Sequence, residues 1–309
     1  MLAQMKNDRG LAGEMPRRPF LEGSKPVERI TLSNGVEMPM LGYGTLQITD
    51  PAQCQQCVSD AIACGYRLID TAAAYGNEQA VGAAVRQAGV PRSELFITTK
   101  LWVQDAGYEN TLKAFDISLK KLGLDYLDLY LIHQPFGDYY GAWRAMERLY
   151  GEGAARAIGV SNFSPERLVD ICMNQEVAPM VNQIEIHPFY QQAEALSIMK
   201  AYHVTPQAWG PLSEAQKGIL QHRTLEKIAE RHGRSVAQII LRWHYQRGLP
   251  TVTKTVHRAR MIENLDIFDF TLTEREMAAI ASMDIGHSEI IDHHSFCTAR
   301  QLNQIKIYA

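Results

Sequence analysis

The amino-acid sequence predicts an α/β fold, a (β/α)₈ TIM barrel with an N-terminal β-hairpin at the bottom of the barrel. Eight short apolar runs alternate along the chain with longer stretches of helical periodicity, and parallel strands require helical crossovers of this kind. The chain has 309 residues, of which 46% are hydrophobic, and one such barrel commonly takes roughly 250 residues. We therefore expect residues 27–309, including the C-terminal tail, to form a single domain.

The expected elements begin with the hairpin. Arg29–Leu32 and Val36–Met38 flank Asn34-Gly35, a pair that suits the positive φ angles of a tight turn. Eight strand candidates follow at Leu41–Thr45, Tyr66–Asp70, Leu95–Lys100, Leu127–Ile132, Ala155–Val160, Val181–Ile186, Val204–Trp209 and Thr251–Lys254. Helix candidates lie between them at Ala52–Ala63, Asn77–Ala88, Tyr108–Leu122, Gly141–Tyr150, Pro165–Gln175, Glu194–Tyr202, Gly218–His232 and Ser235–Arg247. The carboxyl ends of the strands should meet at one end of the barrel, where the chemistry of such folds lies.

Composition and charge argue against several classes of function. The formal net charge is −3, which gives no reason to expect nucleic acid or an acidic membrane as a partner. Residues 1–26 carry scattered basic residues and prolines without an apolar run long enough for a signal peptide or a membrane span. We expect this segment to be a flexible N-terminal extension and the protein to be a monomer or weak homo-oligomer.

The cysteines and histidines give no metal-site pattern. The five cysteines, Cys54, Cys57, Cys64, Cys172 and Cys297, are an odd number without the spacing of a disulfide-rich fold, so we expect reduced thiols and a cytoplasmic location. Cys54 and Cys57 have the spacing of a redox or zinc motif, but they lie in an expected helix and no second pair completes a site. The tail histidines His287, His293 and His294 lack a matching carboxylate or thiolate pattern. No metal is expected.

Four polar residues are expected at the same end of the barrel. Asp70, Lys100 and His133 stand at or directly after the ends of expected strands, and Tyr75 follows Asp70 closely. A phenol has an unperturbed pKa near 10, which a neighbouring ammonium group lowers. Each residue alone could be a packed or ion-paired core group. Together, a tyrosine between a lysine–aspartate pair and a histidine can give a proton to a carbonyl oxygen, which indicates a carbonyl reductase.

The same residues lie in motifs that resemble the aldo-keto reductase family, in its bacterial type with a short C-terminal tail. The motifs stand in family order as Asp70–Glu78 (DTAAAYGNE), Thr99–Trp102 (TKLW), Tyr130–Pro135 (YLIHQP), Gly159–Phe163 (GVSNF) and Asn182–Glu185 (NQIE). The resemblance covers about Val27 to Asp284, and several motifs in order are far more specific than any one of them. It implies reduction of aldehydes or reactive ketones to alcohols with NADPH.

The resemblance assigns the catalytic roles. Tyr75 would donate the proton to the carbonyl oxygen as hydride reaches the carbonyl carbon, and Lys100 would lower the pKa of Tyr75. Asp70 would hold and neutralise Lys100. His133 would orient the carbonyl through a second hydrogen bond.

No glycine-rich dinucleotide motif follows the first strand, so a Rossmann dehydrogenase is not expected, and the cofactor signals lie in the second half of the chain. The resemblance implies that Lys254, Thr255 and Arg260 hold the 2′-phosphate of NADPH and that Glu263 and Asn264 meet the adenine. A helix N-terminus there adds amide donors. Ser161, Asn162 and Gln183 would bind the nicotinamide carboxamide, and Trp209 would stack on the ring. By the same resemblance we also expect Gly44, Thr45, Gly210, Leu212, Ser213 and Val256 at the cofactor.

The substrate wall is expected to contain Leu46, Trp102, His133 and Tyr139. Many relatives carry an aromatic residue where this chain has Leu46, and the segment Gly286–Ala309 is expected to be an exposed polar tail. Both features predict an open pocket for small polar or α-dicarbonyl substrates. Two alternatives stay open: an NADPH-binding redox-sensing protein with little turnover, and an enzyme that runs mainly as an alcohol dehydrogenase.

Overall fold

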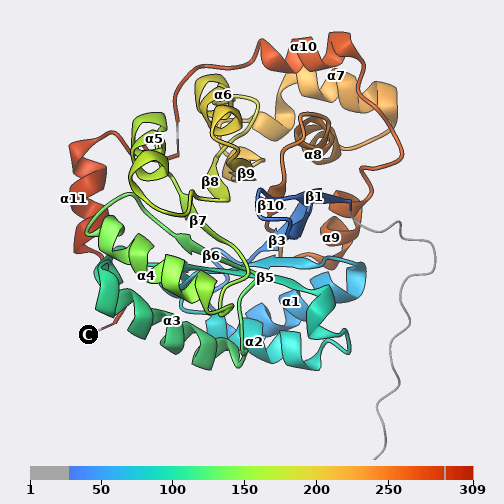
Figure 1. Cartoon of the computed structure of the whole chain (residues 1–309). Helices are drawn as coiled ribbons and strands as arrows, with labels where there is room; N and C mark the ends of the chain where they lie inside the picture. The colour runs from blue at the N-terminus through green and yellow to red at the C-terminus, as the bar shows by residue number, and fades with distance from the viewer. Residues whose placement is uncertain (1–27, 289, 309) are drawn as a thin grey trace, which may run out of the picture.

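The computed structural model describes residues 28–288 and 290–308, so the extension expected over residues 1–26 lies outside the described residues. Eight parallel strands form a closed barrel in the order β10-β3-β4-β5-β6-β7-β8-β9 (Figure 1). Their bounds are β3 Leu41–Gly44, β4 Leu68–Asp70, β5 Phe96–Leu101, β6 Leu129–Ile132, β7 Ile158–Ser161, β8 Val181–Glu185, β9 Thr205–Trp209 and β10 Thr251–Thr253. The predicted (β/α)₈ barrel is confirmed, and each observed strand overlaps its expected run.

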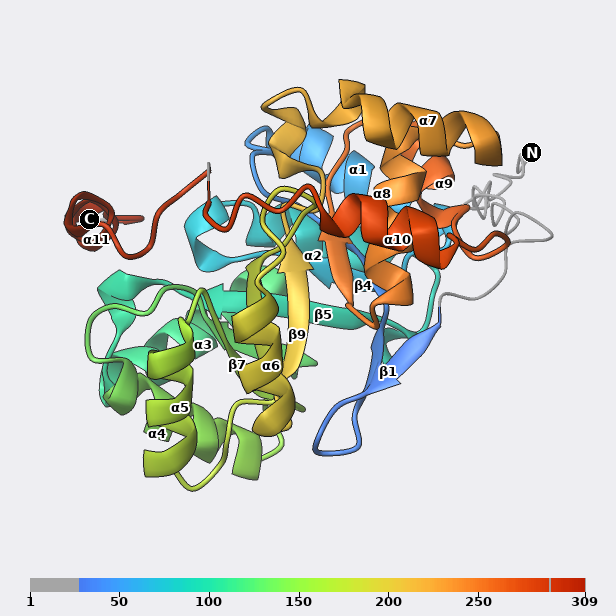
Figure 2. The same ribbon diagram turned by 90° about the horizontal axis from the view of Figure 1, so that it is seen from above.

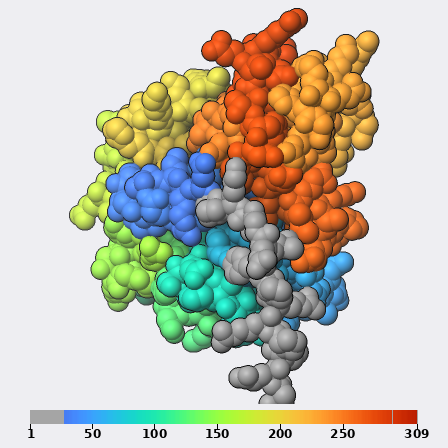
Figure 3. Space-filling view, turned by 90° about the vertical axis from the view of Figure 1, so that its right-hand side faces the viewer, coloured from blue at the N-terminus to red at the C-terminus, as the bar shows by residue number. Residues whose placement is uncertain are grey.

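The N-terminal hairpin is also confirmed. Strands β1 (Arg29–Thr31) and β2 (Glu37–Pro39) pair antiparallel, and Gly35 has a φ angle of +85° in the turn, which only glycine adopts without strain. Met38 is fully buried, and its sulfur accepts a hydrogen bond from Gln207 of β9. Figure 3 shows the hairpin in blue on the surface, close to elements from the C-terminal half of the chain in orange.

Helices surround the barrel (Figures 1 and 2). They are α1 Pro51–Cys64, α2 Glu78–Gln87, α3 Tyr108–Leu122, α4 Tyr139–Gly151, α5 Pro165–Asn174, α6 Ala193–Ala201, α7 Arg223–His232, α8 Val236–Gln246, α9 Arg258–Leu265, α10 Glu274–Ala281 and α11 Phe296–Gln304. Local signals set the helix ends. The Asp50 side chain caps α1 by accepting from the Gln53 backbone N–H, and Gly65 ends the helix at a φ angle of +118°. Cys54 and Cys57 lie on the buried side of this helix. No described helix combines the length and the apolar character needed to cross a membrane.

The expectation of an exposed polar tail is partly wrong. The segment after α10 runs across the molecule to α11 (Figure 2), and Leu302 of α11 is buried. The indole nitrogen of Trp102 donates to the Ile305 carbonyl at 3.0 Å, and Ser288 donates to the buried Glu185 carboxylate at 2.7 Å. These two hydrogen bonds hold the tail against the carboxyl ends of the strands.

Candidate active site

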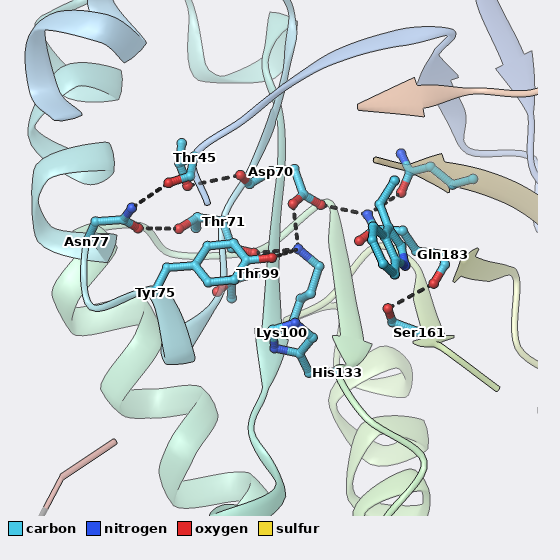
Figure 4. A network of polar contacts seen from close by, with 12 residues as sticks. Thr45, Asp70, Thr71, Tyr75, Asn77, Thr99, Lys100, His133, Ser161 and Gln183 are labelled. Atoms are coloured by element: carbon cyan, nitrogen blue, oxygen red, sulfur yellow. Dashed lines mark hydrogen bonds and ion pairs between the residues drawn. The ribbon is translucent and has the colours of Figure 1, made fainter. Parts of the chain in front are cut away.

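The four predicted catalytic side chains converge at the carboxyl end of the barrel (Figure 4). Asp70 is the last residue of β4, Lys100 is near the end of β5, and His133 directly follows β6. Tyr75 ends the short 3₁₀ helix η1 (Ala73–Tyr75) that follows β4. Parallel register explains the convergence, because strand ends on one side of a closed barrel form a single rim.

Lys100 is the centre of the cluster and is completely buried. Its Nζ lies 2.5 Å from Asp70 Oδ1, 3.0 Å from the Thr71 carbonyl oxygen and 3.4 Å from the Tyr75 hydroxyl (Figure 4). Burial alone would lower the pKa of Lys100, but attraction to Asp70 and Tyr75 raises it above its ordinary value. The ammonium group therefore stays charged beside the phenol.

Tyr75 experiences opposing effects. Burial raises the pKa of its hydroxyl, Lys100 lowers it and Asp70 raises it, and the net direction is upward. Lys100 thus acts in the direction expected from the sequence, but the effect of burial on the pKa is larger. Tyr75 is consequently a protonated phenol near neutral pH and can donate its hydrogen.

His133 lies between two aromatic rings. Its ring centroid is 5.6 Å from that of Tyr75 and 5.2 Å from that of Trp102, both edge-on. Burial and the Lys100 charge hold the pKa of His133 well below its ordinary value, so the imidazole is neutral. Nδ1 is buried without a hydrogen-bond partner in the described part of the chain, which leaves Nε2 as the ring nitrogen available to a molecule in the cavity.

Several predicted cofactor residues are hydrogen-bonded to this cluster. The Gln183 amide donates to Asp70 Oδ2 and to Gln207 Oε1, each at 2.8 Å. Asn162 donates to the His133 carbonyl at 3.0 Å and accepts from the Trp209 indole at 2.9 Å. Ser161 donates to the Gln183 backbone. These contacts fix the predicted nicotinamide-binding groups relative to Asp70 and His133.

One cavity of about 1160 Å³ extends over the cluster. It is lined by predicted residues of all three roles: Gly44, Leu46, Asp70, Tyr75, Trp102, His133, Ser161, Asn162, Gln183, Trp209, Gly210, Leu212, Lys254, Thr255, Val256, Arg260, Glu263 and Asn264. Four predicted residues do not line it. Lys100 is buried behind Tyr75. The Thr45 hydroxyl donates a hydrogen bond to the Asp70 backbone carbonyl. Ser213 is buried, and the Tyr139 ring packs on Phe163 and Tyr140 instead.

The two predicted phosphate-binding cations are exposed. Lys254 follows β10 and Arg260 lies in the first turn of α9, and neither has a carboxylate partner among residues 28–288 and 290–308. The neighbouring Arg258 differs, because its guanidinium approaches Asp60 at 3.7 Å. Unpaired cations at the start of a helix form a site suited to an anion.

The sequence reasoning missed two groups of cavity residues. One comprises Glu214, Ala215, Gln216 and Leu220 after β9 together with Ser235, Val236 and Ala237 at the start of α8. The Ser235–Gln238 capping box is a local signal that could have placed the α8 terminus there. The other comprises Gln134 and the tail residues Ile290, Ile291, His293 and Ile305, and no periodic pattern marks them.

Comparison with known proteins agrees with this geometry. The model of the aldo/keto reductase family matches residues 40–285. The chain is 47% identical over 258 residues to a glyoxal reductase of Bacillus subtilis, covering 83% of this chain and 93% of that protein. It is 43% identical over 280 residues to a morphine 6-dehydrogenase of Pseudomonas putida, covering 86% and 94%.

Solved structures give the same result. An aldo/keto reductase from Brucella melitensis superposes with a TM-score of 0.80 at 47% identity, covering 84% of this chain and 100% of that one. A Bombyx mori aldo-keto reductase in complex with NADP superposes with a TM-score of 0.82 at 36% identity, covering 87% and 96%. The matched segment contains the barrel and all four residues of the buried cluster, and the chain belongs to the aldo-keto reductase family.

Proposed function

We propose that this protein reduces aldehydes or reactive ketones to alcohols with NADPH, and that Tyr75 is the proton donor. The observation that carries the proposal is the buried Lys100 ammonium, which joins Asp70 and Tyr75 beside a neutral His133 at the cavity wall. A structural ion pair has no need of a phenol and an imidazole that both face a cavity. A carbonyl oxygen that gains negative charge needs both donors.

The residues divide the chemistry as follows. When bound, NADPH supplies the hydride that reaches the carbonyl carbon. Tyr75 gives its hydroxyl proton to the carbonyl oxygen, and the phenolate left behind is stabilised by Lys100 until a proton returns from water. His133 Nε2 donates a hydrogen bond that orients the carbonyl. Asp70 keeps Lys100 charged and in place.

The cavity lining fits NADPH. Lys254 and Arg260 are unpaired cations suited to the 2′-phosphate, with Glu263 and Asn264 on the same helix for the adenine. Trp209 lines the cavity with its indole nitrogen held by Asn162, a fixed ring face on which a nicotinamide can stack. Two cations that have no carboxylate partner within the described ranges favour NADPH over NADH, because NADH lacks the 2′-phosphate that would lie between them.

Small polar carbonyl compounds, α-dicarbonyls among them, are the proposed substrates. Two observations support this class: the glyoxal reductase relative, and the aliphatic Leu46 in the cavity wall at a position where many relatives carry an aromatic residue. The pocket is less open than expected, because Ile290, Ile291 and Ile305 of the tail line the same cavity. A wall added by the tail favours compact substrates further.

The test is the oxidation of NADPH, followed by its absorbance, with glyoxal, methylglyoxal, sugars, aromatic aldehydes and steroids. We expect turnover to be highest with the α-dicarbonyls. Steroids as the best substrates by a wide margin would refute the proposed substrate class. NADPH binding without turnover of any carbonyl would favour a redox-sensing protein, and faster alcohol oxidation than carbonyl reduction at matched pH would favour a dehydrogenase.

A further inference from the structure

Gln134 and His293 form a polar pair in the cavity wall beside His133. Gln134 directly follows His133 at the end of β6, and His293 comes from the tail. His293 Nε2 lies 3.0 Å from Gln134 Oε1, and both side chains line the cavity. The contact joins residues 159 positions apart in the sequence.

The chemistry of this pair fixes the direction of the hydrogen bond. An amide oxygen only accepts, so His293 Nε2 must carry the hydrogen and donate. Burial lowers the pKa of His293 to about 4, so the ring is neutral at physiological pH and the pair carries no charge. Gln134 Nε2 has no hydrogen-bond partner within the described ranges. Its two hydrogens are therefore available to a molecule in the cavity.

Apolar side chains share the cavity with this pair. Leu46, Trp102, Ile290, Ile291 and Ile305 line the same cavity. A few placed polar groups in an apolar wall fix the orientation of a ligand. His133 lines the same cavity, and His293 lies near enough to His133 to contribute to the lowering of its pKa. The Gln134 amide is therefore close enough to the imidazole that would orient the reacting carbonyl to reach an oxygen on the adjacent carbon.

We propose that Gln134 donates a hydrogen bond to the second oxygen of substrates that carry one on the carbon next to the reacting carbonyl. This class comprises α-dicarbonyls, α-hydroxyaldehydes and α-hydroxyketones, and the assignment rests on the proposed carbonyl reduction. His293 is a positioning residue that holds the Gln134 amide in this orientation. The tail reaches the site because Ser288 and Ile305 are hydrogen-bonded on either side of His293.

The test compares methylglyoxal with propanal, which differ only by the second carbonyl. We would measure kcat and KM with NADPH for Gln134→Leu and His293→Phe, with Gln56→Leu on the exposed side of α1 as the matched control. The ratio of kcat/KM for methylglyoxal to that for propanal should fall about tenfold in both cavity variants, through KM for methylglyoxal. The control should keep the wild-type ratio. His293→Gln, which retains an N–H donor, should lose less than His293→Phe.

An unchanged ratio, or equal losses for both substrates, would overturn the proposal while leaving the reductase activity intact. If the wild type reduces neither compound, a binding measurement tests the Gln134 subsite separately from the proposed carbonyl reduction. Hydroxyacetone, titrated into the protein with NADP⁺ and followed by tryptophan fluorescence, should bind about tenfold more weakly to Gln134→Leu than to the wild type. Equal binding there would also overturn the subsite, whatever the turnover.

Discussion

Removal of the Lys100 charge tests the electrostatic centre of the site. Lys100→Met alone would leave the buried Asp70 carboxylate unpaired, which typically destabilises a protein by about 3–5 kcal/mol. The double variant Asp70→Asn with Lys100→Met removes both charges and keeps similar volumes. The double variant therefore shows how the charged pair changes the pKa of Tyr75, whose hydroxyl lies 3.4 Å from the Lys100 Nζ, without leaving a buried charge unpaired.

The magnitude follows from that distance. At 3.4 Å and an effective dielectric constant of about 20, the ammonium attracts the phenolate by about 5 kcal/mol. The charge of Asp70 opposes this attraction. Because Lys100 lowers the pKa of Tyr75 more than Asp70 raises it, we expect that pKa to rise when both charges are removed. A weaker acid in the same position should reduce turnover at least about tenfold.

The assay is the pH dependence of carbonyl reduction. Reduction requires the protonated phenol, so kcat falls as the pH rises through the pKa of Tyr75 in the complex. In the double variant this fall should move to higher pH. NADPH affinity should stay near the wild-type value, because Lys100 does not line the cavity and Asp70→Asn keeps an oxygen that can accept from Gln183. A fall at the wild-type pH with undiminished turnover would refute the role assigned to Lys100, as would a large loss of NADPH affinity alone.

Two further predictions follow. Arg260→Ala should weaken NADPH binding about tenfold or more and hardly change NADH binding, because only NADPH carries the 2′-phosphate. Titration of both nucleotides, followed by tryptophan fluorescence, measures this, with Arg258→Ala as the control. Equal losses for both nucleotides, or the same loss in the control, would contradict the assignment of Arg260 to the phosphate. Burial raises the pKa of Asp105 to about 6, above its unfolded value of about 3.9, so its ionisation destabilises the folded state as the pH rises from about 4 to above 6. Asp105→Asn should therefore increase the free energy of unfolding by about 2 kcal/mol at pH 8 and leave it unchanged at pH 3. Urea unfolding at both pH values measures this, with exposed Asp116→Asn as the control, and equal stability at pH 8 would show that the Asp105 carboxylate is not desolvated.

The barrel was predictable because its signals are local. Each strand is a short apolar run between helical patterns, and the Asn34-Gly35 turn and the Asp50 cap are chemical signals read within a few residues. The convergence of Asp70, Lys100 and His133 follows from topology alone, since all three stand at the carboxyl ends of parallel strands.

The tail and the balance of charges were not predictable in this way. The hydrogen bonds of His293 to Gln134 and of Trp102 to Ile305 join residues 159 and 203 positions apart, and periodicity carries no information over such separations. The sign of the net shift at Tyr75 depends on how far burial outweighs the Lys100 charge. That balance depends on the packing around the phenol, which composition does not reveal.

The most direct test of proton donation by Tyr75 is Tyr75→Phe, which keeps the ring and removes only the hydroxyl. Single-turnover reduction of methylglyoxal by the preformed NADPH complex, with NADPH affinity measured in parallel by tryptophan fluorescence, separates chemistry from binding. We predict a fall in the rate of about 10²–10⁴-fold with NADPH affinity unchanged. A correctly folded Tyr75→Phe protein that reduces methylglyoxal at a near-wild-type rate would contradict the assignment of Tyr75 as the acid.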